Sequence, residues 1–187
     1  ETSVPYGTLI EQQQLIEELQ AHPEDWREEG TDAGRSIVIK AAPVSRYLAW
    51  IRAEVLDAYA RKVQRAGGID LQIIGVGGRG HVAFHESGIP FQGSEVMLVK
   101  LDDNTVANAV ADGHFTAIEE SPRYAISMGA ELVYRAGTVV LLANGARKVE
   151  AVARSLLDDP TPEVPISYGQ IYSARGGNLY YVLDQIA

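Results

Sequence analysis

Apolar and polar residues are arranged along this chain in blocks that predict strands and helices in alternation. Short apolar runs, bounded by glycine, proline or charged residues, indicate buried strands. The clearest is residues 138–143, Thr-Val-Val-Leu-Leu-Ala. The other predicted strands are residues 36–40, 71–74, 95–100, 123–128 and 178–183.

Apolar positions spaced three or four residues apart predict the helices. The longest stripe begins after Pro43 and repeats through Leu48, Ile51, Val55 and Tyr59 until the glycine pair at residues 67–68. Further helices are predicted over residues 8–21, from Asp102 or Asp103 to about 111, and over 147–157. Residues 23–34 and 158–165 are predicted to be loops, because they are polar, turn-rich and without periodicity.

Strands alternating with helices predict an α/β fold, a doubly wound and mostly parallel sheet with helices on both faces. The sequence contains no internal repeat, low-complexity segment or linker, so we expect one domain over residues 1–187.

The composition and charge of the chain limit the classes of partner that we expect. The chain has 187 residues, 46% of them hydrophobic, and a formal net charge of −9. Because a basic face is needed to bind the phosphate backbone, nucleic acid is not an expected partner. The sequence has no apolar run of membrane-spanning length and no cysteine, which is compatible with a cytoplasmic protein. No residue spacing suggests a metal cage, and we expect no cofactor.

One stretch contains candidate catalytic residues. It comprises residues 73–86, Ile-Ile-Gly-Val-Gly-Gly-Arg-Gly-His-Val-Ala-Phe-His-Glu. It follows a predicted strand, at the position where open α/β sheets bind ligands. His81 is a potential acid or base at neutral pH, and Glu86 is a carboxylate that could orient it. The alternative is structural, with the glycines forming only a tight turn and His81 a satisfied structural histidine.

The string resembles a signature of the glucosamine-6-phosphate deaminase (isomerase) family, which shares its superfamily with 6-phosphogluconolactonase. Family members carry Gly-x-Gly-x-Asp-Gly-His-Ile-Ala-Phe-Asn-Glu-Pro, and the lactonase branch follows its Gly-His with Thr-Ala-Ser-Leu-Phe. Ala83, Phe84 and Glu86 therefore favour the deaminase branch. Residues 105–108, 124–129, 139–142 and the motif Gly145-x-x-Lys148 also follow the family's order, so the similarity runs from about Leu71 to the C-terminus.

The resemblance implies a catalytic role for two residues: His81 opens the sugar ring, assisted by Glu86. It further implies that Lys148 holds the substrate phosphate at the start of a helix. The substrate is then a small anionic sugar. The residues expected to bind it are Gly75, Gly77, Gly78, Arg79, Gly80, His85 and Lys148.

The departures from the signature predict an altered active site. Arg79 stands where the family has an aspartate, His85 replaces an asparagine, and Val110 aligns with a phosphate-binding arginine. The family's first strand, phosphate loop and proton-transferring aspartate have no counterpart, and residues 1–5 resemble the segment directly after that aspartate. We expect the N-terminal βα units to be absent from this chain and supplied by a bound N-terminal fragment of the same protein. A divergent protein that no longer needs that chemistry is the alternative, and a homo-oligomer is a further possibility.

Two other functions stay open at this point. One is lactone or ester hydrolysis, in which a histidine activates water as in the lactonase branch. The other is a non-catalytic sugar-phosphate sensor, for which Arg79 and Val110 are the best support.

Overall fold

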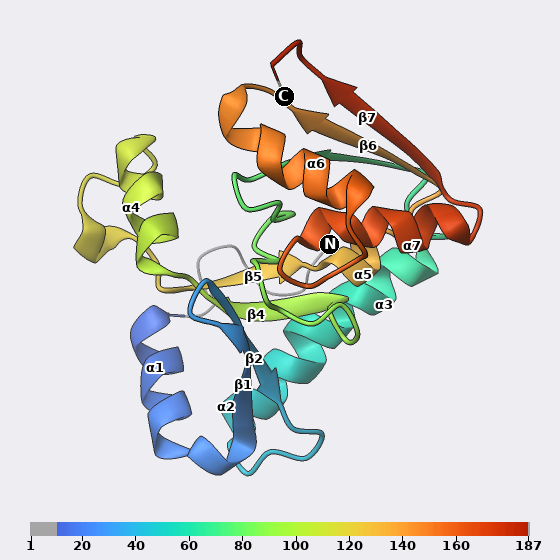
Figure 1. The fold of residues 1–187 in the computed structure, drawn as a ribbon. Coiled ribbons are helices and arrows are strands. Elements are labelled where there is room, and N and C mark those ends of the chain that lie inside the picture. Colours follow the sequence, from blue (N-terminus) through green and yellow to red (C-terminus); the bar gives the residue numbers. More distant parts are fainter. Residues whose placement is uncertain (1–10, 187) are drawn as a thin grey trace.

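The computed structural model describes residues 11–186 and divides their strands between two sheets (Figure 1). One sheet has four antiparallel strands in the order β1-β2-β4-β5, and the other has three parallel strands in the order β3-β6-β7. Their bounds are β1 Trp26–Thr31, β2 Gly34–Ile39, β3 Leu71–Gly75, β4 Val96–Lys100, β5 Tyr124–Met128, β6 Thr138–Ala143 and β7 Asn178–Leu183.

The predicted α/β class is confirmed, but the expected single, mostly parallel sheet is not what the structure shows. All three strand pairs of the first sheet are antiparallel, and only β3, β6 and β7 form a parallel sheet. Buried apolar runs look alike in both kinds of sheet, so the sequence pattern could not distinguish the pairings.

Strand β1 lies in a segment predicted to be a loop, and that prediction was wrong. Its sequence, Trp-Arg-Glu-Glu-Gly-Thr, has a single large apolar residue. The strand forms a hairpin with β2 at the edge of the antiparallel sheet, with Trp26 opposite Ile39. Charged side chains are typical of an edge strand because they discourage pairing with other chains. They also leave the strand without an apolar pattern, so the sequence did not predict it.

The helices are α1 Gln12–Ala21, α2 Arg46–Trp50, α3 Asp57–Arg65, α4 Asp103–Ala111, α5 Ala130–Val133, α6 Val149–Leu157 and α7 Tyr168–Ala174. Short 3₁₀ turns lie at η1 Pro23–Asp25, η3 Ile118–Glu120, η4 Ala146–Lys148 and η5 Pro165–Ser167. The predicted helices are present within the described residues, whereas α5 and α7 were not predicted. Residues 1–5 and 8–10, for which we had expectations, lie outside the described range. Every helix within residues 11–186 is too short or too polar to span a bilayer.

The long predicted helix is continuous but changes its winding. A π-helical segment, η2 Ile51–Leu56, joins α2 to α3. Wider winding rotates the helix relative to a regular 3.6-residue repeat. Leu48 and Ile51 are buried as expected, but Leu56 takes the buried position predicted for Val55, and Tyr59 is exposed.

Each sheet has its own core. In the parallel sheet, Ile74, Val139 and Leu141 pack with residues of α5, α6 and η5. In the antiparallel sheet, Ile37 and Leu98 pack against α1, α2 and η2. Residues 76–95 link the two sheets, and they begin at the carboxyl end of β3. The glycine-rich stretch therefore lies at the sheet edge where α/β proteins bind ligands.

Candidate functional site

A cavity of about 1270 Å³ lies at the carboxyl end of the parallel sheet. The glycine loop, α4, the segment before β5 and the start of α6 form its walls. The structure brings most of the predicted site residues to this cavity, but Gly80 and His85 do not line it. The predicted residues that do are Gly75, Gly77, Gly78, Arg79, His81, Glu86 and Lys148.

His81 and Glu86 face each other at the floor of the cavity. Nδ1 of His81 lies 3.2 Å from Oε2 of Glu86, whose side chain is 1% exposed, whereas the His81 side chain is 34% exposed. Within residues 11–186 neither of these two atoms has a well-aligned hydrogen-bond partner. The buried carboxylate thus meets one nitrogen of the imidazole, which leaves the Nε2 side of the ring for a ligand.

Gly77 makes room for the imidazole. A Cβ atom at this position would lie 2.0 Å from Cε1 of His81, so no other residue fits without moving the ring. The Gly77 N–H donates to the carbonyl of His81, and its own carbonyl accepts from the Gly80 N–H. This turn folds the loop back so that His81 lies over the glycine backbone.

Gly80 supports the site rather than contacting a ligand. Its φ of +78° lies in the left-handed region that glycine adopts without strain, and a Cβ would lie 2.9 Å from Val164. The Gly80 carbonyl accepts from the Ile166 N–H. The residue therefore anchors the loop to η5, and the structure does not bear out the prediction that it binds substrate.

Arg79 is held by acids of the chain itself. Its Nη2 donates to Oδ2 of Asp102 at 2.6 Å and lies 3.9 Å from Oε2 of Glu86. The hydrogen bond to Asp102 raises the pKa of Arg79. Burial raises the pKa of Asp102, but the bonds from Arg79 and Thr105 outweigh it, and the net shift is downward. Arg79 thus partly neutralises both acids while remaining 43% exposed at the cavity.

His85 is a structural residue, and its position does not fit the prediction that it binds substrate. The side chain is fully buried. Its Nδ1 accepts from the Ala130 N–H at 3.0 Å, so the neutral ring donates from Nε2 to the Ile89 carbonyl at 3.0 Å. Burial lowers the pKa of His85 below its ordinary 6.5. His85 therefore links the start of α5, which follows β5, to the loop after Glu86. It has no free nitrogen for a ligand.

Two adjacent cations, Arg147 and Lys148, also line the cavity. Lys148 ends η4 and directly precedes α6, and Arg147 is its neighbour. Burial, together with repulsion by Arg147, lowers the pKa of Lys148. Neither side chain forms an ion pair with an acid in the part of the chain that the structure describes. A pair of uncompensated cations at the start of a helix favours an anionic ligand.

Arg147 and the polar wall of α4 were not predicted from the sequence. Asn104 and Asn108 are four residues apart and therefore share a helix face, which lines the cavity together with Thr105. The Oγ atom of Ser121, at the same cavity, is buried without a partner among the described residues. The spacing of the asparagines was the available signal. Val110, the position aligned with the family's arginine, does not line the cavity.

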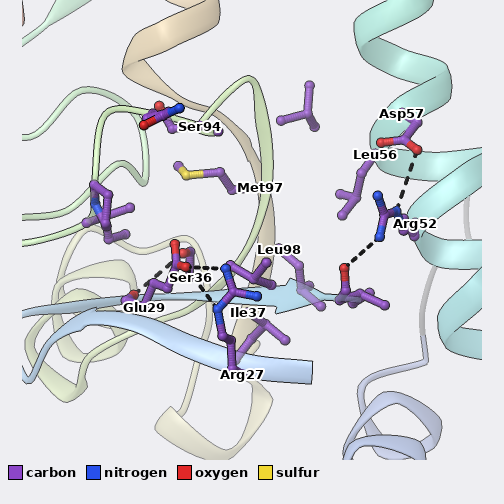
Figure 2. A pocket seen from close by; sticks show the side chains of 17 residues that line it. Arg27, Glu29, Ser36, Ile37, Arg52, Leu56, Asp57, Ser94, Met97 and Leu98 are labelled. Carbon is purple, nitrogen blue, oxygen red and sulfur yellow. Dashed lines mark hydrogen bonds and ion pairs between the residues drawn. The ribbon is translucent and has the colours of Figure 1, made fainter. Parts of the chain in front are cut away.

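A second hollow of about 500 Å³ lies between the β1–β2 hairpin, β4 and the helix η2–α3 (Figure 2). Its charged groups already have partners. Arg27 pairs with Glu29, and Arg52 pairs with Asp57 and donates to the carbonyl of Ile39 (Figure 2). With its cations neutralised and no histidine in its lining, this hollow is a weaker candidate for catalysis than the cavity at His81.

One group of potential metal ligands is present within residues 11–186: His22, Glu24 and Asp25. Asp25 is buried and already accepts from the Val44 and Ser45 N–H groups and pairs with Lys40 Nζ at 2.7 Å. Its role is to hold the loop before α2, and the group offers no case for a metal.

Comparisons with known proteins identify the family and the fold of the chain. A sequence model of the family described as glucosamine-6-phosphate isomerases/6-phosphogluconolactonase matches residues 37–175. The glucosamine-6-phosphate deaminase of Clostridium botulinum (strain Kyoto / Type A2) is 40% identical over 114 residues, 61% of this chain and 46% of the relative. That of Clostridium acetobutylicum is 38% identical over 117 residues, 62% of this chain and 47% of the relative. The chain thus spans about half the length of the curated relatives it matches.

A solved structure of a monomeric glucosamine-6-phosphate deaminase resembles the fold. It superimposes with a TM-score of 0.62 at 20% identity, covering 94% of this chain and 80% of that chain. At this identity the likeness concerns the fold.

Proposed function

The chain belongs to the family of glucosamine-6-phosphate isomerases and 6-phosphogluconolactonases, and on that basis we propose that its cavity binds and converts a small phosphorylated sugar. The observation that carries the proposal is the pair formed by His81 and the buried Glu86, 3.2 Å apart at the floor of the cavity.

In this proposal His81 is the general acid and base that opens the sugar ring. A ring-opening step removes a proton from the anomeric hydroxyl and delivers one to the ring oxygen, and an imidazole with one free nitrogen can do both in turn. Glu86 lies on the Nδ1 side and stabilises the charged imidazolium that forms in between. Its burial strengthens this effect because the carboxylate is poorly screened by water.

Lys148 and Arg147 are the proposed anion site. They line the same cavity as α4, whose asparagines Asn104 and Asn108 offer hydrogen bonds to sugar hydroxyls. The glycine backbone from Gly75 to Gly78 lets the sugar approach the loop closely.

Arg79 is the proposed reason for a substrate other than glucosamine 6-phosphate. It places a cation beside Glu86 where the family signature has an acid, so the site carries less negative charge than the signature would give it, although Asp102 pairs with Arg79. A less negative site attracts a protonated amine on the substrate less strongly and accommodates a neutral or acidic substituent better.

The proposal is tested by assaying phosphorylated aldoses, ketoses, amino sugars and sugar lactones, and following the products by NMR. His81→Ala is expected to lower turnover by about 10²–10⁴-fold with a small change in stability, because the side chain is partly exposed. His22→Ala is the matched control, since His22 lies at the end of α1 outside the cavity.

Each outcome assigns the function. Isomerisation or deamination that depends on His81 supports the proposal, and full activity of His81→Ala refutes it. Hydrolysis of a lactone alone would place the chemistry with the lactonase alternative. Thermal stabilisation by sugar phosphates without turnover would indicate a non-catalytic sensor.

A further inference from the structure

The two carboxylate oxygens of Glu86 have different neighbours. Oγ1 of Thr105, in the first turn of α4, donates to Oε1 at 3.4 Å. The other oxygen, Oε2, faces the imidazole of His81 and has no aligned hydrogen bond within residues 11–186. Gly34 of β2 fixes the base of the side chain, because a Cβ added there would collide with the Cβ of Glu86. The groups around Oε2 therefore decide how this carboxylate acts.

Two nitrogen groups compete for Oε2. Nδ1 of His81 lies 3.2 Å from it, and Nη2 of Arg79 lies 3.9 Å from it. No other basic group among the described residues is at ion-pair distance from Glu86. A guanidinium is always charged and matches the geometry of a carboxylate, whereas an imidazole is neutral for part of the time near pH 7. A free Arg79 would therefore take the oxygen from His81.

Asp102 holds Arg79 back. Its Oδ2 accepts from Nη2 of Arg79 at 2.6 Å, and Nη2 is the same nitrogen that faces Glu86. Asp102 is itself held in place, because its Oδ1 accepts from the Thr105 N–H at 2.6 Å and its side chain is only 10% exposed. Asp102 does not line the cavity, so any effect on a bound sugar passes through other residues.

We propose that Asp102 is a positioning residue of the site, which restrains Arg79 and so leaves Oε2 of Glu86 to the imidazole of His81. This inference rests on the proposed function, in which Glu86 stabilises the imidazolium during ring opening. Asp102 balances the charge of Arg79, and the charge of Glu86 then acts on His81. An acid is thus present beside the glycine loop, although position 79 carries a cation.

Asp102→Asn and Arg79→Met, made singly and together, test the proposal without a substrate. Asparagine caps a helix as well as aspartate does, but its single carbonyl oxygen cannot accept from both Thr105 and Arg79. Arg79 is then released towards Glu86. The readout is the ¹⁵N resonance of His81 Nδ1, which responds to the hydrogen bond with the carboxylate.

The two single variants are expected to move this resonance in opposite directions. Asp102→Asn weakens the contact between Glu86 and Nδ1, whereas Arg79→Met removes the competitor. The double variant should match Arg79→Met, because Asp102 acts only through the arginine and its loss then has no further effect.

Asp103→Asn is the matched control. Asp103 is the next residue at the same helix start, its side chain is 97% exposed, and it pairs with Arg123 instead. Its substitution should leave the His81 resonance in place. The sequence has four histidines, and His81→Ala assigns the resonance by its absence.

Kinetics on the substrate identified from the panel give a second readout. Asp102→Asn should lower kcat about 10-fold or more, because small misplacements of catalytic groups are costly, with little change in KM. Adding Arg79→Met should restore kcat, even if KM rises because Arg79 lines the cavity. If Asp102 only supported the helix start, the second substitution could not repair the loss.

An unchanged His81 resonance in Asp102→Asn would overturn the proposal. So would a change of equal size with and without Arg79. The resonance is measured in the free protein, so the expected shifts in a protein that converts no sugar would support the restraint of Arg79 and count against the proposed function alone.

Discussion

Single contacts fix the geometry around His81. The imidazole lies against Gly77 with no space for a methyl group, and Glu86 occupies the other side of the ring. Gly78, one residue further along, has no such constraint, because its nearest neighbour for an added Cβ is the Arg147 carbonyl oxygen at 3.6 Å. Two adjacent glycines are therefore expected to differ sharply in their tolerance of substitution.

Gly77→Ala should displace the His81 ring from Glu86 and lower turnover at least about 10-fold, because small misplacements of a catalytic group are costly. Gly78→Ala is the comparison: it should leave the His81 ring in place, so any effect of its methyl group on the bound sugar should raise KM without lowering kcat. The check is steady-state kinetics on the substrate identified from the panel, together with the NMR resonance of the His81 Cε1–H group, which should shift only in Gly77→Ala. Equal effects of the two substitutions would contradict the assigned role of Gly77.

His85 gives the fold a pH dependence that is separate from catalysis. Its pKa in the folded protein lies below the ordinary 6.5 because the ring is buried and neutral. The unfolded chain then binds the proton more readily, so the stability from His85 is complete above pH 6.5 and declines as the pH falls below it. The slope can reach about 1.4 kcal/mol per pH unit for one proton.

His85→Asn is expected to remove that slope between pH 6.5 and the folded pKa. Asparagine, the residue in the family signature, also has one acceptor and one donor for Ala130 and Ile89, yet does not titrate. Urea unfolding of both proteins from pH 5 to 8 provides the measurement. The other three histidines are unchanged in the variant, so an unaltered slope would show that the pH dependence does not come from His85.

Among the helices and strands, those predicted best from the sequence are strands whose position depends only on burying their apolar residues. Residues 138–143 and 178–183 were expected as strands, and β6 and β7 have those bounds. β1 and the π-helical η2 were not predictable, because one depends on an edge position and the other on local winding. The family and the cavity could be inferred from the motif around His81. The roles of His85 and Gly80 could not, because they depend on contacts with Ala130 and Ile166, distant in sequence.

Helix α4 shows how one residue can serve two elements. Oδ1 of Asp102 accepts from the Thr105 N–H at 2.6 Å and so caps the helix, while Oδ2 binds Arg79 of the glycine loop. The first helical turn and the cavity wall are thereby joined through a single carboxylate.

Asp102→Ala and Asp102→Asn separate these two functions. Asparagine is as good a cap as aspartate, so Asp102→Ala should be less stable than Asp102→Asn by about 1 kcal/mol, measured by urea unfolding at pH 7. Because the folded pKa of Asp102 is lowered from 3.8, its charge stabilises the protein above pH 3.8 and that contribution is lost as the pH falls further. Neither variant should show this loss of stability below pH 3.8, because neither has the carboxylate. Equal stability of the two variants at pH 7 would exclude the capping role.

For the whole molecule, the question is whether the two sheets unfold together. Contacts join them directly and through the linking segment 76–95: Met128 of β5 packs on the core of the parallel sheet, Thr31 donates to the Ser87 carbonyl, and Phe91 packs edge-on against Tyr168 with ring centroids 4.6 Å apart. These contacts support the proposal that residues 1–187 form one domain.

Leu141→Ala tests that proposal with a built-in reporter. Leu141 is fully buried in the core of the parallel sheet, whereas both tryptophans of the sequence, Trp26 and Trp50, pack on the core of the antiparallel sheet. Truncation of a buried leucine costs about 2–5 kcal/mol. If the two cores unfold as one unit, tryptophan fluorescence must report that whole loss, although neither tryptophan belongs to the mutated core. Leu157→Ala, at an exposed position, should change stability by less than about 0.5 kcal/mol.

The opposite outcome is an unfolding transition that is unchanged by tryptophan fluorescence but shifted by circular dichroism. It would divide the chain into two independently folding parts. The cavity between the glycine loop and α4 would then form only when both parts are folded.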